Sequence, residues 1–540
     1  MTLLEVFNEV SVKPQNIKEL KDLILNLAVQ GKLTVHWREV NTTVEHISAA
    51  EKFTADELPI ELQKLPSSWT APILEETAYI NGGFAFKSSL YKSDGMRVVR
   101  ISDFDEDGFK DKNIVRYNYS NEHKKYVLEE GNILMAMTGG TVGKRLYVDN
   151  LPEQMIVNQR VATIKVHDSQ SSEYVNIVLG TNQIQNVINN AKNSTNDNIS
   201  MRTIKGFVIP LPPLEEQKEI VRVVHELFQE IDNLSIKLEL ASDLKEDFTT
   251  SALRELTTSN DVSQIWNTLQ QQFNEFFDSV SGVKKLRETI LELAVQGKLT
   301  ANWREEYPNL EPASELLKRI QAEKQQLITE KKIKRSKSHP DPVNQFKGIL
   351  NWNTTSLANL GITQTGTTPA TSDRTNYGDF IPFIGPADIS NDQTIQSFSR
   401  SLSKSGLTKG RLIPENSLMM VCIGGSIGKC NINSMDVSCN QQINCITPIL
   451  IPAEFIRVIC QSKSFQKEVK INASGSATPV INRTKWESIV VPVPPLDEQI
   501  EIVRVVDSLM GLCNQLEEAI TLKEEQAALL MKSCVAEALG

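Results

Sequence analysis

The sequence predicts an α+β protein: two mixed α/β domains separated by long antiparallel coiled-coil helices, arranged as a pseudo-twofold tandem repeat. Three observations lead to this prediction. The heptapeptide AVQGKLT occurs at 28–34 and again at 294–300. The motif Pro-Pro-Leu-(Glu/Asp)-Glu-Gln occurs at 212–217 and 494–499, and Ile-Val-Arg-Val-Val follows both copies after two residues. Between these motifs, short β-rich runs are separated by Gly, Asn, Asp and Ser.

The repeat covers nearly the whole chain of 540 residues, as two units of about 1–258 and 268–540. The copies are displaced by 266 residues at the heptapeptide and by 282 at the proline motif. Most of the excess lies between 304 and 352, where unit two alone carries a basic stretch. We interpret it as a solvated linker insertion. Its cations are Lys331, Lys332, Lys334, Arg335 and Lys337.

The repeat divides the chain into helical regions that alternate with two mixed domains. The expected helical regions are 1–59, 213–344 (with the linker) and 495–540, and the expected mixed domains are 60–212 and 345–494.

Each unit begins with a short amphipathic helix, expected at 17–30 and 283–296. In the first, Leu20, Ile24 and Leu27 form one apolar stripe. Each helix is followed by a glycine, Gly31 or Gly297. Glycine just past the last helical residue fits a left-handed C-cap, so AVQGKLT marks a helix end.

A long helix follows each proline motif. Apolar residues recur in alternating steps of four and three from Ile220 to Ala241 and from Ile502 to Cys534, which is a heptad seam. We expect the first helix to run from 214 to about 245, roughly 48 Å at about 1.5 Å per residue. Such a seam needs a partner, and the helices of the other unit supply a symmetric one.

The mixed domains carry runs typical of buried strands, which we expect at 96–101, 133–137, 161–166 and 417–423. Loops on such a scaffold usually hold the binding residues.

The formal charge of −10 is unevenly distributed. Lys and Arg balance Asp and Glu at about 0 in 71–210 and about +3 in 351–494, which leaves about −13 for the rest. If the chain binds DNA, the mixed domains are the electrostatically plausible surface.

All seven cysteines lie in unit two without a Cys-x-x-Cys pair, so reduced, partly buried thiols are expected rather than a disulfide framework or zinc site. No apolar run is long enough for a membrane span, and the N-terminus lacks the apolar core of a signal peptide. We expect a cytoplasmic protein.

A glycine loop recurs in both domains, as Gly-Gly-Thr-Val-Gly-Lys at 139–144 and Gly-Gly-Ser-Ile-Gly-Lys at 424–429. The Walker pattern fails, because its first Gly is replaced by Thr138 or Ile423 and its final Ser/Thr by Arg145 or Cys430. The loop either brings backbone N–H groups and a lysine to a DNA phosphate or simply closes two strands as a tight turn.

A second shared feature is Asn-Gln, at 158–159 and 440–441. These side chains, with the following Arg160 or Gln442, can pair with adenine or guanine edges, or can satisfy buried backbone. All DNA-binding candidates are Gly82, Gly83, Lys87, Arg100, Ser102, Thr138, Gly139, Gly140, Lys144, Asn158, Gln159, Arg160, Arg202, Thr367, Thr368, Gly424, Gly425, Ser426, Lys429, Asn440, Gln441, Gln442, Arg483 and Lys485.

Catalytic signatures are missing from the sequence. It has no Asn/Asp-Pro-Pro-Tyr of adenine methyltransferases, no Gly-x-Gly-x-x-Gly and no His-Glu-x-x-His, and the six histidines do not cluster. We expect neither a catalytic residue nor a metal ligand in this chain.

The proline motif that opens a coiled coil, the helix ending Leu-Ala-Val-Gln-Gly-Lys-Leu, the segment Glu-Pro-Ala-Ser-Glu-Leu-Leu at 311–317 and the glycine loops together resemble specificity subunits of type I restriction-modification systems. The resemblance implies two target-recognition domains for double-stranded DNA, joined by helical regions that bind two methyltransferase subunits and, in the full endonuclease, two restriction subunits. S-adenosylmethionine, ATP and Mg²⁺ would be cofactors of those partners.

Two other interpretations stay open at this point. A coiled-coil scaffold or inhibitor would bind protein partners without reading DNA sequence. A nucleotide-dependent enzyme would use the glycine loops.

Overall fold

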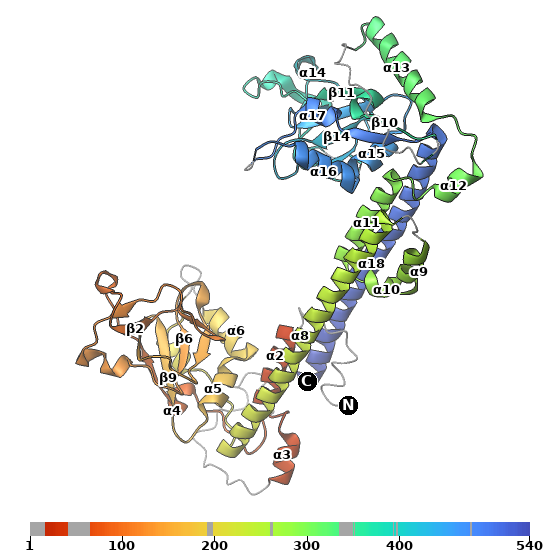
Figure 1. The fold of residues 1–540 in the computed structure, drawn as a ribbon. Helices are drawn as coiled ribbons and strands as arrows, with labels where there is room; N and C mark the ends of the chain where they lie inside the picture. The colour runs from red at the N-terminus through yellow and green to blue at the C-terminus, as the bar shows by residue number, and fades with distance from the viewer. Residues whose placement is uncertain are drawn as a thin grey trace. The chain divides into compact units, whose positions relative to one another are not determined.

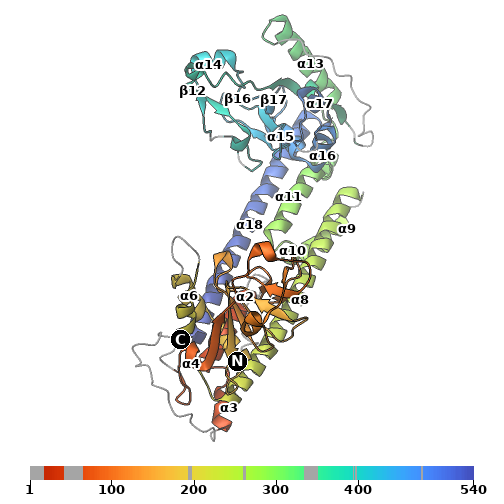
Figure 2. The ribbon, with the colours of Figure 1, turned by 90° about the vertical axis from the view of Figure 1, so that its left-hand side faces the viewer.

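The computed structural model describes residues 17–41, 65–191, 198–259, 263–333, 349, 351–392, 394–395, 398–475 and 478–539. The chain forms two compact units, residues 1–242 with 525–540, and residues 243–524. Figures 1 and 2 trace the elements of each unit. Lys334, Arg335 and Lys337 of the expected linker lie outside the described residues.

Unit 1 holds a four-stranded antiparallel sheet in the order β1-β9-β6-β7 and a smaller sheet in the order β5-β2-β8, in which β2 and β8 run parallel. β6 is buried along its whole length, as its unbroken apolar sequence predicts. The strands are β1 (Ala78–Gly82), β2 (Met96–Val99), β3 (Phe104–Asp105), β4 (Gly108–Phe109), β5 (Arg116–Tyr117), β6 (Ile133–Ala136), β7 (Arg145–Tyr147), β8 (Met155–Val157) and β9 (Val161–Val166).

The helices of unit 1 pack on the larger sheet. Helix α5 covers one face, on the side of α2 and α8 (Figure 1), and buried residues of all three helices share one core with β1, β6 and β9. The helices are α2 (Ile17–Val29), α3 (Val35–Val40), α4 (Leu74–Thr77), α5 (Ser172–Leu179), α6 (Asn182–Ala191) and α7 (Met201–Lys205), with the long α8 (Leu214–Thr258) continuing into unit 2.

Unit 2 repeats the plan. Its four-stranded sheet has the order β11-β17-β14-β15, and β12 pairs in parallel with β16 as β2 does with β8. In Figure 2 the arm formed by β12 and α14 lies on the side of the domain away from α17. The strands are β10 (Asn353–Ser356), β11 (Gly361–Thr365), β12 (Tyr377–Ile384), β13 (Ser401–Leu402), β14 (Leu418–Val421), β15 (Cys430–Ile432), β16 (Ser438–Cys439), β17 (Ile443–Pro448) and β18 (Val490–Val493).

The helices of unit 2 come both before and after its strands in the chain. They are α9 (Ser263–Gln271), α10 (Phe273–Phe276), α11 (Val280–Val295), α12 (Ala301–Glu306), α13 (Ala313–Thr329), α14 (Lys404–Lys409), α15 (Ala453–Gln461), α16 (Lys463–Asn472), α17 (Arg483–Glu487) and α18 (Leu496–Leu539), whose last part, from 525 on, belongs to unit 1. Gly31, which follows α2, and Gly297, which follows α11, have φ values of +69° and +70°. The predicted left-handed caps are confirmed.

The long helix α8 differs from its expected length. It runs to Thr258 rather than to about 245, so it has 45 residues and a length of about 68 Å. The heptad seam ends at Ala241, but Thr249, Leu253 and Leu256 form a second buried stripe further along. Because no Gly or Pro occurs between 214 and 258, nothing in the sequence interrupts the helix.

The six cysteines whose side chains are described are all buried and free, as expected. Burial raises the pKa of the Cys422 thiol to about 11 and that of Cys430 to about 12, so both are protonated and unreactive near neutral pH. Among the described residues, no helix is long and apolar enough to cross a membrane.

Candidate nucleic-acid interface

The sheet register gathers the candidate loops of unit 1 at one end of the larger sheet. Gly82 at the end of β1 pairs with Ala162 near the start of β9, and Ala136 at the end of β6 pairs with Val161. A bridge from Thr138 to Asn198 adds the segment before α7. We call this set the first loop edge: residues 82–87, 137–144, 158–160 and 198–202.

Unit 2 builds the same edge with different residues. The end of β11, Thr365, pairs with Asn444 at the start of β17, and Val421 at the end of β14 pairs with Ile443. A bridge from Ile423 to Val480 adds the segment before α17. The second loop edge comprises residues 366–368, 422–429, 440–442 and 478–485.

Backbone hydrogen bonds hold the two edges in equivalent geometry. The N–H of Phe84 donates to the carbonyl of Val157 at 2.8 Å, and Thr367 donates to Cys439 at 2.9 Å. In the same way, the N–H groups of Asn158 and Asn440 donate to carbonyls at the ends of β2 and β12, at 2.9 and 3.2 Å. The scaffold is therefore shared, although most side chains on it differ.

Gly83 and Gly366 each allow their own loop to lie against the Asn-Gln turn of the same unit. A Cβ on Gly83 would lie 2.2 Å from the carbonyl oxygen of Val157, and one on Gly366 would lie 2.1 Å from that of Asn440. Only glycine permits so close an approach. Of the candidates, Gly83 therefore has a structural role in bringing two loops together.

Alanine at Gly83 is expected to lower the free energy of unfolding of unit 1 by about 1–3 kcal/mol, because the added methyl group collides with backbone. Gly82→Ala is the matched control, since a Cβ there meets no atom within 4 Å. Denaturant titration of both variants measures the difference. Equal loss in the two variants would contradict the close approach.

The glycine loops close antiparallel hairpins in both units. Residues Gly139–Thr141 form a 3-10 turn between β6 and β7, and the equivalent loop joins β14 to β15. Gly139 and Gly424 have φ values of +73° and +83°. Both loops are thus tight turns, in which Gly140 and Gly425 are exposed and an added Cβ would meet no atom within 4 Å.

The shared asparagines satisfy backbone groups. The Oδ1 atom of Asn158 accepts from the N–H of Arg160 at 3.2 Å, and Oδ1 of Asn440 accepts from the N–H of Gln442 at 3.0 Å. Gln159 and Gln441 are exposed, and Thr368 donates to Oε1 of Gln441 at 2.5 Å. The asparagines shape the turn, and the residues beside them project from it.

Several candidates already have protein partners. Asp103 accepts from Arg100 at 2.8 Å and from Ser102 at 2.8 Å, and the hydrogen bond that Arg100 donates to Asp103 raises the pKa of Arg100. Arg483 lies 3.6 Å from the carboxylate of Glu487. Nζ of Lys485 donates to the carbonyl of Asn472 at 3.0 Å. These four side chains are less available to a ligand than the sequence alone indicates.

The remaining polar candidates point toward solvent to different degrees. Lys87, Arg160, Arg202 and Lys429 are exposed, whereas Thr138, Lys144, Thr367 and Ser426 are half-buried. All lie on the two loop edges. Lys144 and Lys429 occupy equivalent places, since each backbone N–H donates to the third residue before it in its hairpin turn.

A buried polar network that was not predicted from the sequence recurs in both units. In unit 1 the carboxylate of Glu216, at 1% exposure, accepts from Arg38 at 2.5 Å, from Thr34 at 2.7 Å and from the indole of Trp69 at 3.0 Å. Arg38 also donates to the carbonyl of Gly31 at 2.6 Å. We call this set the framework joint of unit 1.

The framework joint of unit 2 has the same parts. Glu498 is fully buried and accepts from Arg304 at 2.6 Å, from Thr300 at 2.8 Å and from Trp352 at 2.8 Å. Each joint connects the heptapeptide, the first residues of the domain and the proline motif. The repeats themselves were the signal, because all four residue types recur in register.

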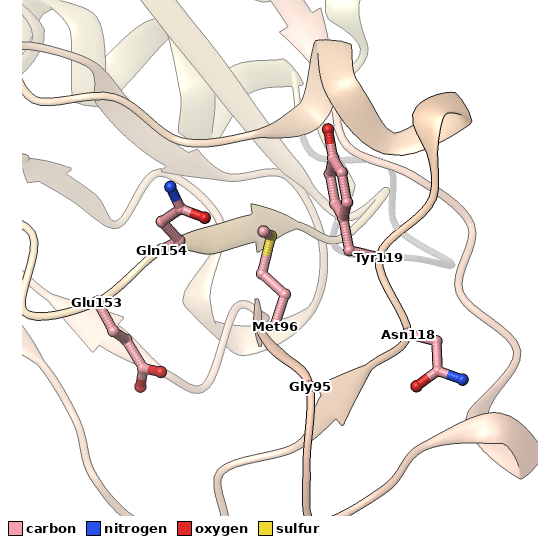
Figure 3. Close-up of a pocket in the computed structure, with 6 residues that line it drawn as sticks. All are labelled: Gly95, Met96, Asn118, Tyr119, Glu153 and Gln154. Carbon is pink, nitrogen blue, oxygen red and sulfur yellow. The ribbon is translucent and has the colours of Figure 1, made fainter.

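A cavity of about 530 Å³ lies elsewhere in unit 1, lined by Gly95, Met96, Asn118, Tyr119, Glu153 and Gln154 (Figure 3). It sits where β2 and β8 begin, whereas the first loop edge lies where they end. Glu153 lines it and pairs with Arg116 at 2.5 Å. In the described part of the chain, no three His, Cys, Asp or Glu side chains are grouped as metal ligands would be.

The fold and the two loop edges define a class of protein: a tandem pair of recognition domains on a helical framework. The family model of the type I restriction modification DNA specificity domain matches residues 66–241 and 349–525. The chain belongs to this family, and so is a type I specificity subunit that recognises DNA targets through two tandem domains, not a catalytic component.

Curated relatives agree with this assignment. The chain is 28% identical to the EcoAI specificity subunit of Escherichia coli over 59% of this chain and 56% of that protein. It is 22% identical to the E. coli EcoEI specificity subunit over 93% of this chain and 91% of that protein. A chain from a solved type I restriction-modification system matches with a TM-score of 0.52 at 16% identity, covering 88% of this chain and 98% of that one, which shows a common fold.

Proposed function

We propose that each domain reads one half of an asymmetric, bipartite target in double-stranded DNA with its loop edge. The observation that carries this proposal is that the loop edges have the same backbone geometry but different side chains. Equivalent scaffolds present similar surfaces to two half-sites, and unlike side chains select unlike sequences.

Charge supports the same assignment. The mixed domains are about neutral (71–210) and about +3 (351–494), whereas the rest of the chain is about −13, and Lys144 and Lys429 recur at equivalent turns of the loop edges. Cations at fixed places suit contacts to the phosphate backbone, which position a protein on DNA without reading its sequence. The acidic helices suit protein partners instead.

The long helices α8 and α18 then set the distance between the half-sites and dock two methyltransferase subunits, with two restriction subunits joining in a full endonuclease. S-adenosylmethionine, ATP and Mg²⁺ would be used by these partners. The methyltransferase would flip the target adenine, a step for which this chain needs no catalytic residue. A complex that acts on chromosomal DNA works in the cytoplasm.

Domain exchange tests this function. Replacing residues 66–212 with the corresponding domain of another specificity subunit is expected to change one half of the methylated sequence and to leave the other half intact. Methylation mapping of the assembled complex measures both halves at once, so the unexchanged half serves as the internal control.

Two outcomes would contradict the proposal. A change in both halves, or in neither, would show that the domains do not read half-sites separately. Weak, salt-sensitive and sequence-independent DNA binding by the native complex would favour a scaffold protein.

A further inference from the structure

One position of the loop edges differs in charge although its backbone is equivalent in the two units. The third residue of the Asn-Gln turn is Arg160 in unit 1 and Gln442 in unit 2. Both N–H groups donate to the asparagine two residues earlier. Both carbonyls also accept from the residue after the hairpin strand, Arg160 from Met137 at 2.9 Å and Gln442 from Cys422 at 2.8 Å.

The side chain of Arg160 is exposed on this fixed turn. Within the described residues its guanidinium makes no hydrogen bond or ion pair. Four other arginines of the domain are paired with carboxylates: Arg97 with Asp111, Arg100 with Asp103, Arg116 with Glu153 and Arg145 with Glu106. Arg160 therefore presents its donors to a ligand from an anchored backbone.

Comparing the two units distinguishes a cation that contacts phosphate from a cation that contacts a base. Lys144 recurs as Lys429, as expected for contacts to phosphate, which both half-sites offer equally. Arg160 does not recur, because Gln442 replaces it with a neutral amide whose Oε1 accepts from Asn440 at 3.1 Å. The two half-sites have the same phosphate backbone and differ in their bases. A residue that differs between equivalent positions of the two domains is therefore expected to contact a base.

We propose that Arg160 determines specificity at one position of the half-site read by the first domain, by donating two parallel hydrogen bonds to O6 and N7 of a guanine in the major groove. This geometry matches the planar guanidinium, which is the commonest reader of guanine. The inference rests on the proposed function, since it requires that the first loop edge faces DNA.

The experiment uses the full chain assembled with its methyltransferase subunits and DNA libraries randomised in each half-site. Arg160→Gln, which installs the side chain of the second domain, is expected to lower methylation of the preferred sequence roughly 5- to 150-fold and to abolish the guanine preference at one position. The other half-site should be unchanged, which also reports that the complex is assembled and folded.

Two further variants separate base reading from charge. Arg160→Lys keeps the charge but loses the planar fork, so it should weaken the guanine preference while the salt dependence of binding stays the same. Lys144→Gln is the matched control for a phosphate contact. It should weaken all sequences alike and reduce the slope of log K against log salt by about one.

Equal weakening of all sequences by Arg160→Gln, with the lower salt slope, would assign Arg160 to phosphate and overturn the inference. An unchanged sequence preference in Arg160→Gln would overturn it as well. Failure of the proposed function looks different, because the native complex itself would then show no half-site preference in the library.

Discussion

Replacing Glu216 with alanine is expected to lower the free energy of unfolding of unit 1 by about 3 kcal/mol, the lower end for a broken buried ion pair, because Glu216 is buried but its partner Arg38 is 20% exposed. The carboxylate of Glu216 accepts from Arg38, Thr34 and Trp69. Its loss removes the acceptor of Thr34 and Trp69 at a site that water scarcely reaches, since Glu216 is 1% exposed, while Arg38 keeps its hydrogen bond to the carbonyl of Gly31.

Hydrogen-deuterium exchange of the purified chain measures this effect domain by domain. Protection at the Thr70–Leu211 bridge of unit 1 should fall, while the β10–β18 pair of unit 2 keeps its protection. Glu215→Ala is the matched control, because that neighbouring carboxylate is exposed and pairs with the exposed Lys218. Comparable losses in the two variants would contradict a structural role for the joint.

The framework joint also shows where sequence reasoning ends. The heptapeptide and the proline motif are visible as repeats, and their local structures, a left-handed cap and a helix start, follow from glycine and proline. The hydrogen bond between Thr34 and Glu216, which lie 182 residues apart, does not follow from the sequence, because no periodicity encodes a contact between distant segments. The recurrence of the same residues at matching places in both repeat units was the one indication of this contact.

The candidate interface, like the framework joint, could be predicted from the sequence only in its local structure. Apolar runs in the sequence predicted the positions of β2, β6, β9 and β14. The loops that follow strands were predicted to hold binding residues, because loops on a rigid scaffold commonly do. The parallel pairing of β2 with β8, which brings the end of β2 beside Asn158, depends on a long-range pairing that the sequence does not state. The shared partner of Arg100 and Ser102 is local in sequence, since Asp103 directly follows Ser102 and lies three residues after Arg100.

The helix α8 makes the second large prediction. Inserting four residues after Glu239 is expected to lengthen the unspecified gap of the target by one or two base pairs and to preserve both half-sites. The insertion adds about 6 Å to the helix at about 1.5 Å per residue, and base pairs are about 3.4 Å apart. Methylation mapping measures the gap directly.

The chain offers a suitable place for this change. All residues from 239 to 244 are exposed and lie between Ile231, the last buried residue of the heptad seam, and Thr249, so an insertion there disturbs no buried side chain. Four residues exceed one helical turn by about 40°, which keeps the second stripe close to its original face. The matched control replaces Glu239, Leu240 and Ser242 with alanine at constant length and should keep the original gap.

An active insertion variant with the original gap would contradict the spacer role of α8. It would also show that half-site reading and spacing are independent, because each domain could still read its half-site while an element other than α8 set the distance. A longer gap with both half-sites intact would instead tie the spacing to helix length alone. In that case the loop edges would choose the bases and the 45 residues of α8 would choose the separation.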